Sequence, residues 1–292
     1  MIGELAALAS ALAFGFSTIL ARRFMGEVAP EAGVLVSIVV NVTVFVGLSV
    51  LAATGGQLAL LRLEAVALFV AGGLAGTLVG RNLSYQSIGR IGASLSVTIR
   101  LSSAVFTLLI GYLVLREFPR ASQLWGTAAV LLGLWVSLRP AAAPAGRGPA
   151  DPRGVLLALA SAVAFAVGDV ARRAGLAITP VPVFGAAVGA SVALGAHLLW
   201  GRVHRAARWP SRAVLLRGDV AGSALLNTAA ILCLYVGLRH APAAIVSVLY
   251  NLQVLVVLVA GPIVLKSREP LSGWVAAGAA LALAGTTLIL AG

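Results

Sequence analysis

The stretch ALAFGFSTILARR, at residues 11–23, recurs as AVAFAVGDVARR at residues 162–173 with one residue deleted. Further identities follow at a constant offset of 150 residues, in the pairs Pro30 and Pro180, Tyr85 and Tyr235, Ala93 and Ala243, and Gly111 and Gly261. Trp125 and Trp274 each begin the last hydrophobic run of a half. Because several matches share nearly one offset, we interpret the chain as a tandem duplication.

Hydrophobic runs bounded by Arg, Pro and Gly fill both copies. A run of about 20 apolar residues is long enough to cross a hydrocarbon core about 30 Å thick. None of the runs alternates as the strands of an outer-membrane barrel do, and a helix satisfies its backbone polar groups internally. We therefore predict transmembrane helices at residues 4–21, 32–53, 65–87, 92–115, 123–139, 154–172, 182–200, 219–238, 243–265 and 272–290.

An odd number of helices in each copy has a geometric consequence. The second copy must enter the membrane upside down relative to the first, and inverted repeats of this kind are typical of transporters, with the substrate site between the halves. The sequence predicts an all-α membrane protein: ten transmembrane helices as two inverted five-helix repeats around a central cavity. The repeats are expected at residues 1–139 and 154–292, with a Pro/Gly/Ala-rich linker at 140–153. A purely structural duplication is the alternative.

The composition supports membrane embedding. The 292 residues are 60% hydrophobic and 10% charged, with a mean hydropathy of +1.04, whereas soluble domains are about 45–50% apolar and about 25% charged. The net charge of +12 is better explained by cationic loops than by nucleic-acid binding, because no basic patch is interleaved with exposed aromatics. Cys233 is the only cysteine, so no disulfide framework forms. The expected partners are the lipid bilayer and a small-molecule substrate, and the chain is expected to be a monomer or a weak homodimer.

Loop charge predicts the orientation. The odd-numbered connections carry 13 Lys and Arg residues and the even-numbered ones carry 6, the latter including Arg172 and Arg173. Cytoplasmic loops hold the excess of positive charge, so both termini are expected outside the cytoplasm. The first hydrophobic run lacks a basic segment before it and is interpreted as a retained helix of a protein in the bacterial inner membrane.

Two long segments carry a family resemblance. They are SYQSIGRIGASLSVTIRLSSAVFTLLIGYLVLREFPRASQLW (84–125) and LYVGLRHAPAAIVSVLYNLQVLVVLVAGPIVLKSREPLSGW (234–274). Each joins two helices by a short basic turn with small residues and ends in an apolar run and a Glu, Glu117 or Glu269. This pattern resembles the drug/metabolite transporter superfamily, in its ten-helix branch of EamA-type exporters. Ala104 and Val254 stand where that family often has Pro.

The resemblance implies a secondary transporter for small organic molecules. Its overall character is similar to the subgroup that exports aromatic and other amino acids, and we expect export of amino acids or similar zwitterions by alternating access. Efflux of lipophilic drugs is the alternative within transport, and a membrane-embedded enzyme or lipid scramblase is the alternative of another class. The family is commonly described with both termini in the cytoplasm, which disagrees with the loop charges.

Polar residues within the spans are the candidate substrate site, since an ionised side chain at the centre of a membrane helix costs about 2.5–3.5 kcal/mol on insertion scales. Ser96, Arg100, Ser103 and Thr107 share one helix face, and the Arg100 guanidinium suits a substrate carboxylate; a structural Arg paired with carbonyls or with Asp169 is the alternative. The other predicted substrate-binding residues are Asn82, Tyr85, Tyr235, Ser247, Tyr250 and Asn251. Tyr85 and Tyr235 could instead belong to an interfacial aromatic belt.

Two further groups are expected to support transport. Asp169 is the candidate for proton coupling, and the alternative is an Asp near a helix end that pairs with Arg172 or Arg173. Gly72, Gly76 and Gly80 follow a spacing that lets helices approach closely, for packing or for a sliding gate. The sequence has no P-loop, no zinc-protease motif and no nucleophile elbow, so we expect no catalysis, no cofactor and no metal.

Overall fold

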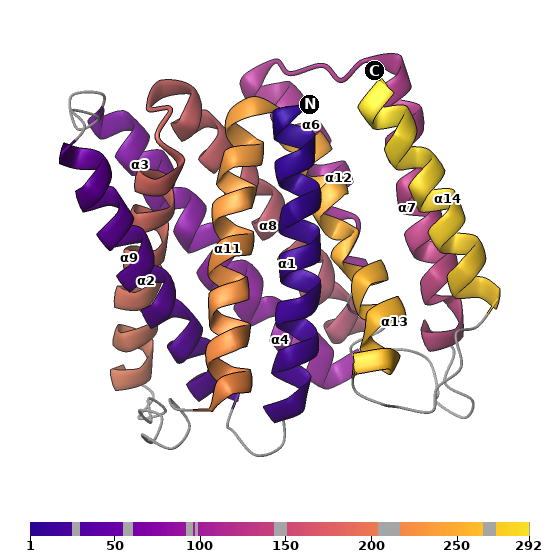
Figure 1. Cartoon of the computed structure of the whole chain (residues 1–292), viewed down its shortest axis with the longest axis horizontal. Coiled ribbons are helices and arrows are strands. Elements are labelled where there is room, and N and C mark those ends of the chain that lie inside the picture. Colours follow the sequence, from indigo (N-terminus) through magenta and orange to yellow (C-terminus); the bar gives the residue numbers. More distant parts are fainter. Residues whose placement is uncertain are drawn as a thin grey trace.

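The computed structural model describes residues 1–24, 30–54, 61–91, 96, 99–142, 151–203, 217–264 and 273–291. All regular structure within these ranges is helical (Figure 1). Seven of the described helical segments are long and apolar enough to cross a membrane, and three shorter apolar helices, Ser103–Leu115, Ala121–Val136 and Ala276–Ala291, accompany them. The predicted all-helical membrane fold is confirmed.

The first half of the chain begins with two uninterrupted helices, α1 (Ile2–Phe24) and α2 (Pro30–Thr54). The next rod is composite, because α3 (Leu63–Gly72) passes into a π-helix, η2 (Gly73–Gly80), and then into α4 (Arg81–Ile91). The half is completed by α6 (Ser103–Leu115) and α7 (Ala121–Ala142). Residues 92–95, 97 and 98, at the predicted start of the fourth span, lie outside the described ranges.

The second half repeats this order. Its helices are α8 (Pro152–Ile178), α9 (Pro182–Val203), α11 (Gly218–His240), α12 (Ala243–Asn251), α13 (Gln253–Val264) and α14 (Gly273–Ala291). The largest departure from the predicted boundaries is α8, which ends six residues beyond residue 172. It ends at Thr179, which is extended at φ −121° and ψ 93°, because the residue before a proline disfavours the helical region.

Contacts at the two ends of the bundle show that the repeats are inverted. At one end, Glu117 contacts both Arg173, near the end of α8, and Ala243, at the start of α12. Gly3, at the start of α1, packs against Ala241 at this same end. At the other end, Asp151 before α8 pairs with Arg90 of α4. Since α1 begins where its counterpart α8 ends, equivalent helices run in opposite directions.

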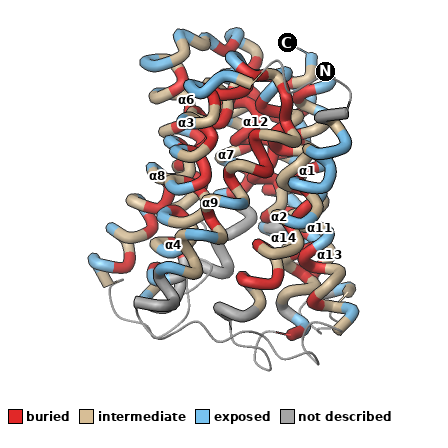
Figure 2. The backbone as a smooth tube through the Cα atoms, turned by 90° about the vertical axis from the view of Figure 1, so that its left-hand side faces the viewer, coloured by how far each residue is buried: buried red, intermediate tan, exposed pale blue. Residues whose placement is uncertain are grey.

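The halves are interleaved rather than side by side. Helix α1 packs on α11, α12 and α13, while its counterpart α8 packs on α3, η2, α4 and α6. The pair α7 and α14 forms one edge of the molecule, and α2 and α9 lie at the other (Figure 1). Every residue of α12 is buried, and buried residues concentrate along the inner helices (Figure 2). Helix α12 is therefore at the seam between the repeats.

Candidate functional site

The rods that meet at the seam are interrupted at equivalent points. In the second repeat the rod breaks at Leu252 between α12 and α13, and in the first it turns at residues 101–102 before α6. At both turns the backbone bonds three residues back, from Ser102 N to Ile99 O at 3.0 Å and from Leu252 N to Leu249 O at 3.1 Å. Discontinuous helices at mid-membrane are where many transporters bind substrate.

An ion pair is buried beside the second break. Asp169 and Arg172 of α8 are 1% and 7% exposed, and Arg172 Nη1 lies 2.8 Å from Asp169 Oδ1. The Tyr250 hydroxyl, two residues before Leu252, donates to the other carboxylate oxygen at 3.2 Å. The carboxylate of the second repeat's first helix is thus tied to the broken rod of the same repeat.

The guanidinium of Arg172 reaches from α8 into the first repeat. Its Nη2 donates to Gly72 O at 3.0 Å and to Thr77 Oγ1 at 3.2 Å. The ring of Tyr235 from α11 lies 5.8 Å from its central carbon, a cation–π distance. Thr77 sits within the π-helix, a type of irregularity that is frequent at functional sites.

The glycines of this rod make room for α8. A Cβ added to Gly72 would lie 2.8 Å from Arg172 Cγ, and one added to Gly76 would lie 2.7 Å from Arg172 Nη2. A Cβ on Gly80 would lie 3.3 Å from the Phe165 ring. All three glycines of the predicted packing or gating stripe therefore face α8, within one chain.

The remaining predicted residues of α6 and α12 meet across the seam. Ser103, Ser247 and Asn251 are buried. The hydroxyl of Thr107 lies 3.5 Å from that of Ser247, and Asn251 Nδ2 donates to the Ser247 carbonyl at 2.9 Å. The structure thus brings the second-repeat residues of the predicted site close to those of the first.

Arg100 and the residues of α4 take other positions. The Arg100 guanidinium lies 5.5 Å from the centre of the Phe165 ring of α8, and Ser96 is buried. Asn82 is exposed on α4. The side chain of Tyr85 lies outside the described part of the structure. Asp169 pairs with Arg172.

The loop-charge count is wrong for Arg172. That count treats Arg172 as a loop residue, whereas it lies six residues before the end of α8 and is buried. Its pairing with Asp169 is the alternative that the sequence analysis gave for Asp169, and the i, i+3 spacing places the two side chains on one helix face. Thr77 and the π-helix carry no sequence signature that would have marked them.

A second cluster ties α8, α11 and α12 to the α6–α7 connection at the end of the bundle where α1 begins. Arg173 Nε donates to Glu117 Oε1 at 2.6 Å, and its Nη1 donates to the carbonyls of Leu238 and Arg239, both at 2.9 Å. Glu117 Oε2 accepts from the amide of Ala243 at 3.1 Å, at the N-terminus of α12, where negative charge is favourable. We refer to Glu117, Arg173 and Ala243 as the Glu117 clasp.

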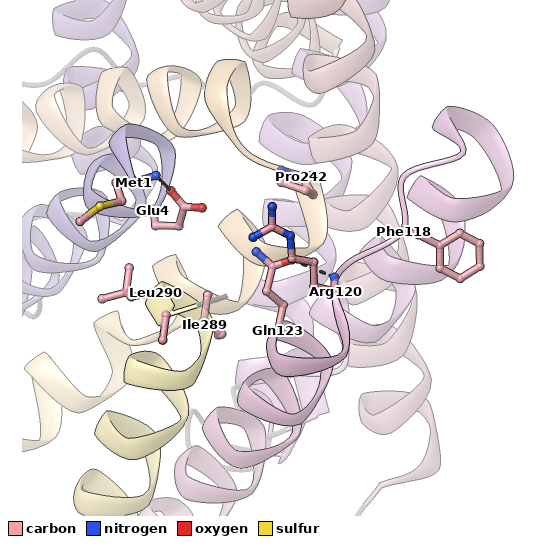
Figure 3. A pocket seen from close by; sticks show the side chains of 9 residues that line it. Met1, Glu4, Phe118, Arg120, Gln123, Pro242, Ile289 and Leu290 are labelled. Atoms are coloured by element: carbon pink, nitrogen blue, oxygen red, sulfur yellow. Dashed lines mark hydrogen bonds and ion pairs between the residues drawn. The ribbon is translucent and has the colours of Figure 1, made fainter.

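A pocket of about 490 Å³ opens at this same end. Its lining residues come from α1, the α6–α7 connection, α7, the turn before α12, and α14: Met1, Glu4, Phe118, Arg120, Gln123, Pro242, Ile289, Leu290 and Ala291. Figure 3 shows the Glu4 carboxylate and the Arg120 guanidinium on opposite sides of the pocket, while Phe118 points away from it. This pocket is at the mouth of the bundle, whereas the polar residues of the seam are packed against one another.

Inverted repeats and broken helices at their seam are typical of membrane transporters. The chain belongs to the EamA-like transporter family, whose profile matches it twice, at residues 1–139 and 152–291. A solved crystal structure shares the fold, with a TM-score of 0.77 at 19% identity over 98% of this chain and 94% of the other. No curated protein matches the sequence.

Proposed function

We propose that the chain is a secondary transporter that exports amino acids or similar zwitterionic metabolites by alternating access. The observation that supports this is the buried, net-neutral group of Asp169, Arg172 and Tyr250 beside a helix break. Burying a charged pair is expensive, so its position at the seam of two inverted repeats favours a role in binding.

Aromatic amino acids are the first substrates to test. Tyr235 lies over Arg172, and the Phe14 ring is 6.4 Å from that of Tyr250. Aromatic rings close to a charged pair suit a ligand with a polar head and a ring. The two breaks supply a means of opening the seam, because each rod can bend where its backbone bonding changes.

Flux into proteoliposomes tests this function. The purified protein is reconstituted, and uptake of labelled phenylalanine, threonine and methionine is compared with uptake of a quaternary ammonium dye and a fluorescent lipid. We expect saturable amino-acid flux that protein-free vesicles lack. Dye flux without amino-acid flux would identify the alternative, lipophilic drug efflux, and lipid movement alone would identify a scramblase.

The proposed location is the bacterial inner membrane with both termini outside. The two termini lie at the same end of the bundle (Figure 1). Arg172 is buried and so does not belong among the loop charges at the end that holds the termini. Without it, the difference in positive charge between the two ends is larger, which favours this orientation. A reporter that is active only in the cytoplasm should show no activity when it is fused to the C-terminus. Activity of this fusion would place the termini in the cytoplasm.

A further inference from the structure

In the buried pair of Asp169 and Arg172, one N–H donor of the arginine has no acceptor among the described residues. Arg172 donates from Nη1 and Nη2 to protein acceptors, but within the described part of the chain its Nε makes no hydrogen bond. A buried unsatisfied donor is costly, and the residue is 93% buried. A hydrogen-bond acceptor that reaches Arg172 Nε would therefore be bound favourably.

The Asp169 carboxylate is held by two side-chain donors, one of which lies next to a helix break. Asp169 accepts from Arg172 and from the Tyr250 hydroxyl. Tyr250 is two residues from the break at Leu252, so a change of angle between α12 and α13 moves the hydroxyl relative to α8. A displacement of Tyr250 would leave one carboxylate oxygen of Asp169 open to another donor.

We propose that Asp169 and Arg172 form the head-group site for a zwitterionic substrate, an inference that rests on the proposed transport function. The substrate carboxylate binds the Arg172 guanidinium through Nε and one Nη, a fork that matches carboxylate geometry. The substrate ammonium takes the place of Tyr250 at Asp169. In the absence of substrate the two side chains pair with each other, as the structure shows.

A zwitterionic ligand accounts for the presence of two opposite charges, on Asp169 and Arg172, side by side. A zwitterion brings one charge of each sign, so the site is electrically neutral before and after binding. An amine alone or a carboxylic acid alone would leave one buried charge uncompensated, which is strongly unfavourable. The pair should therefore select zwitterions over ligands that carry only half of the head group. This proposal places the substrate carboxylate on Arg172, whereas the sequence analysis named Arg100 for that role, with a structural arginine as the alternative.

The deciding experiment removes both charges together. In the variant Asp169→Asn with Arg172→Gln, no single buried charge is left, and replacing a buried pair by neutral residues is often neutral for stability. Reconstituted wild type and double variant are compared for uptake of labelled phenylalanine, with phenethylamine and 3-phenylpropionate as unlabelled competitors. The matched controls are Asp219→Asn, which loses an ion pair in the first turn of α11, and Arg153→Gln on the exposed start of α8.

For the wild type we expect phenylalanine to compete about 10- to 100-fold better than either half-ligand, the range for one charged hydrogen bond. The double variant should keep its thermal midpoint, raise the KM for phenylalanine by at least about tenfold, and lose the preference for the zwitterion. Both controls should transport like the wild type.

The outcomes separate this inference from the proposed function. Wild-type protein without amino-acid flux would overturn the transport proposal itself. Wild-type flux with an unchanged KM and unchanged selectivity in the double variant would overturn the head-group site alone. If the double variant does not fold, Tyr250→Phe, which removes only the hydroxyl at Asp169, supplies the test. It should keep the wild-type preference and bind the zwitterion more tightly, because one competitor for the carboxylate is gone; weaker zwitterion binding would count against the site.

Discussion

Ser102 and Leu252 adopt the same backbone conformation at equivalent positions of the two repeats, with φ −61° and ψ −13° at Ser102 and φ −58° and ψ −13° at Leu252. Neither break contains a proline. Instead, a polar side chain bonds a backbone carbonyl beside each turn, from Ser102 Oγ to Ile99 O at 2.7 Å and from Asn251 Nδ2 to Ser247 O at 2.9 Å. Such side-chain bonds compete with the helical ladder and bend helices.

Removing the Ser102 hydroxyl at the first break should therefore change the transport rate more than the free energy of unfolding. We expect Ser102→Ala to lower the free energy of unfolding by no more than about 1 kcal/mol and to change the transport rate by about two- to tenfold, the range for one hydrogen bond of about 0.5–1.5 kcal/mol. Thr287→Ala is the matched control, since its hydroxyl bonds the carbonyl three residues back on the exposed face of α14. Equal flux in the two variants would show that the break does not depend on Ser102.

The Glu117 clasp should stabilise the end of the bundle where α1 begins. Glu117→Gln keeps an acceptor for Ala243 but loses the charge that faces Arg173. We expect a loss of about 1.5–3 kcal/mol in the free energy of unfolding, the range for hydrogen bonds to charged groups, measured by thermal or denaturant unfolding in detergent. Glu64→Gln, on the exposed first turn of α3, should change stability little. A Glu117 variant as stable as the Glu64 control would mean that the clasp contributes nothing.

Two glycines provide a matched pair for the packing of α8. A Cβ at Gly76 would lie 2.7 Å from Arg172 Nη2, whereas a Cβ at Gly47 would meet nothing within 4 Å. Gly76→Ala should cost about 1–3 kcal/mol of stability, typical of overpacking, and should reduce transport because Arg172 must move. Gly47→Ala, in the middle of α2, should be neutral or stabilising by up to about 1 kcal/mol. The same thermal midpoint for both variants would contradict the close contact of η2 with α8.

The start of α8 carries an acid-sensitive contact outside the membrane spans. The backbone N–H of Arg153 donates to Asp151 at 3.0 Å, and this bond, assisted by Arg90, lowers the pKa of the Asp151 carboxyl. A group with a lowered folded-state pKa stabilises the fold above its unfolded pKa, near 3.9, and this contribution is lost as the pH falls through the folded-state value.

Asp151→Asn keeps the helix cap and removes the charge. Its thermal midpoint should therefore lie below that of the wild type at pH 7 and converge with it as the pH falls below about 4. Unfolding in detergent across pH 3–7 measures this difference. A difference that persists unchanged at the lowest pH would show that the charge of Asp151 is not its cause.

The hydrophobic runs and the repeat were enough to predict the helices and their inversion, because span length and the number of spans leave few alternatives. The interruptions were not predictable in the same way. Leu252 is an ordinary helix former, and no proline marks the turn. The sequence of the π-helix at Gly73–Gly80 is that of an ordinary helix rich in small residues. Both depend on contacts made only in the folded chain.

The site could be predicted as a set of polar residues but not as an arrangement. Asp169 and Tyr250 were each identified from their position within an apolar span, yet nothing in one sequence indicates that they touch across 81 residues. Arg172 was named only as an alternative partner of Asp169, because a charge near the end of an apolar run resembles a loop residue until its partners are known.

The interleaving of the repeats also has a consequence for biosynthesis. Ser17 of α1 donates its hydroxyl to the Ser223 carbonyl of α11, 206 residues later. At about 5–20 residues per second, α1 stays without this partner for roughly 10–40 s while the ribosome completes the chain. A truncated product that stops within the linker would lack α11, α12 and α13, on which α1 packs. Cellular quality control should therefore remove it quickly.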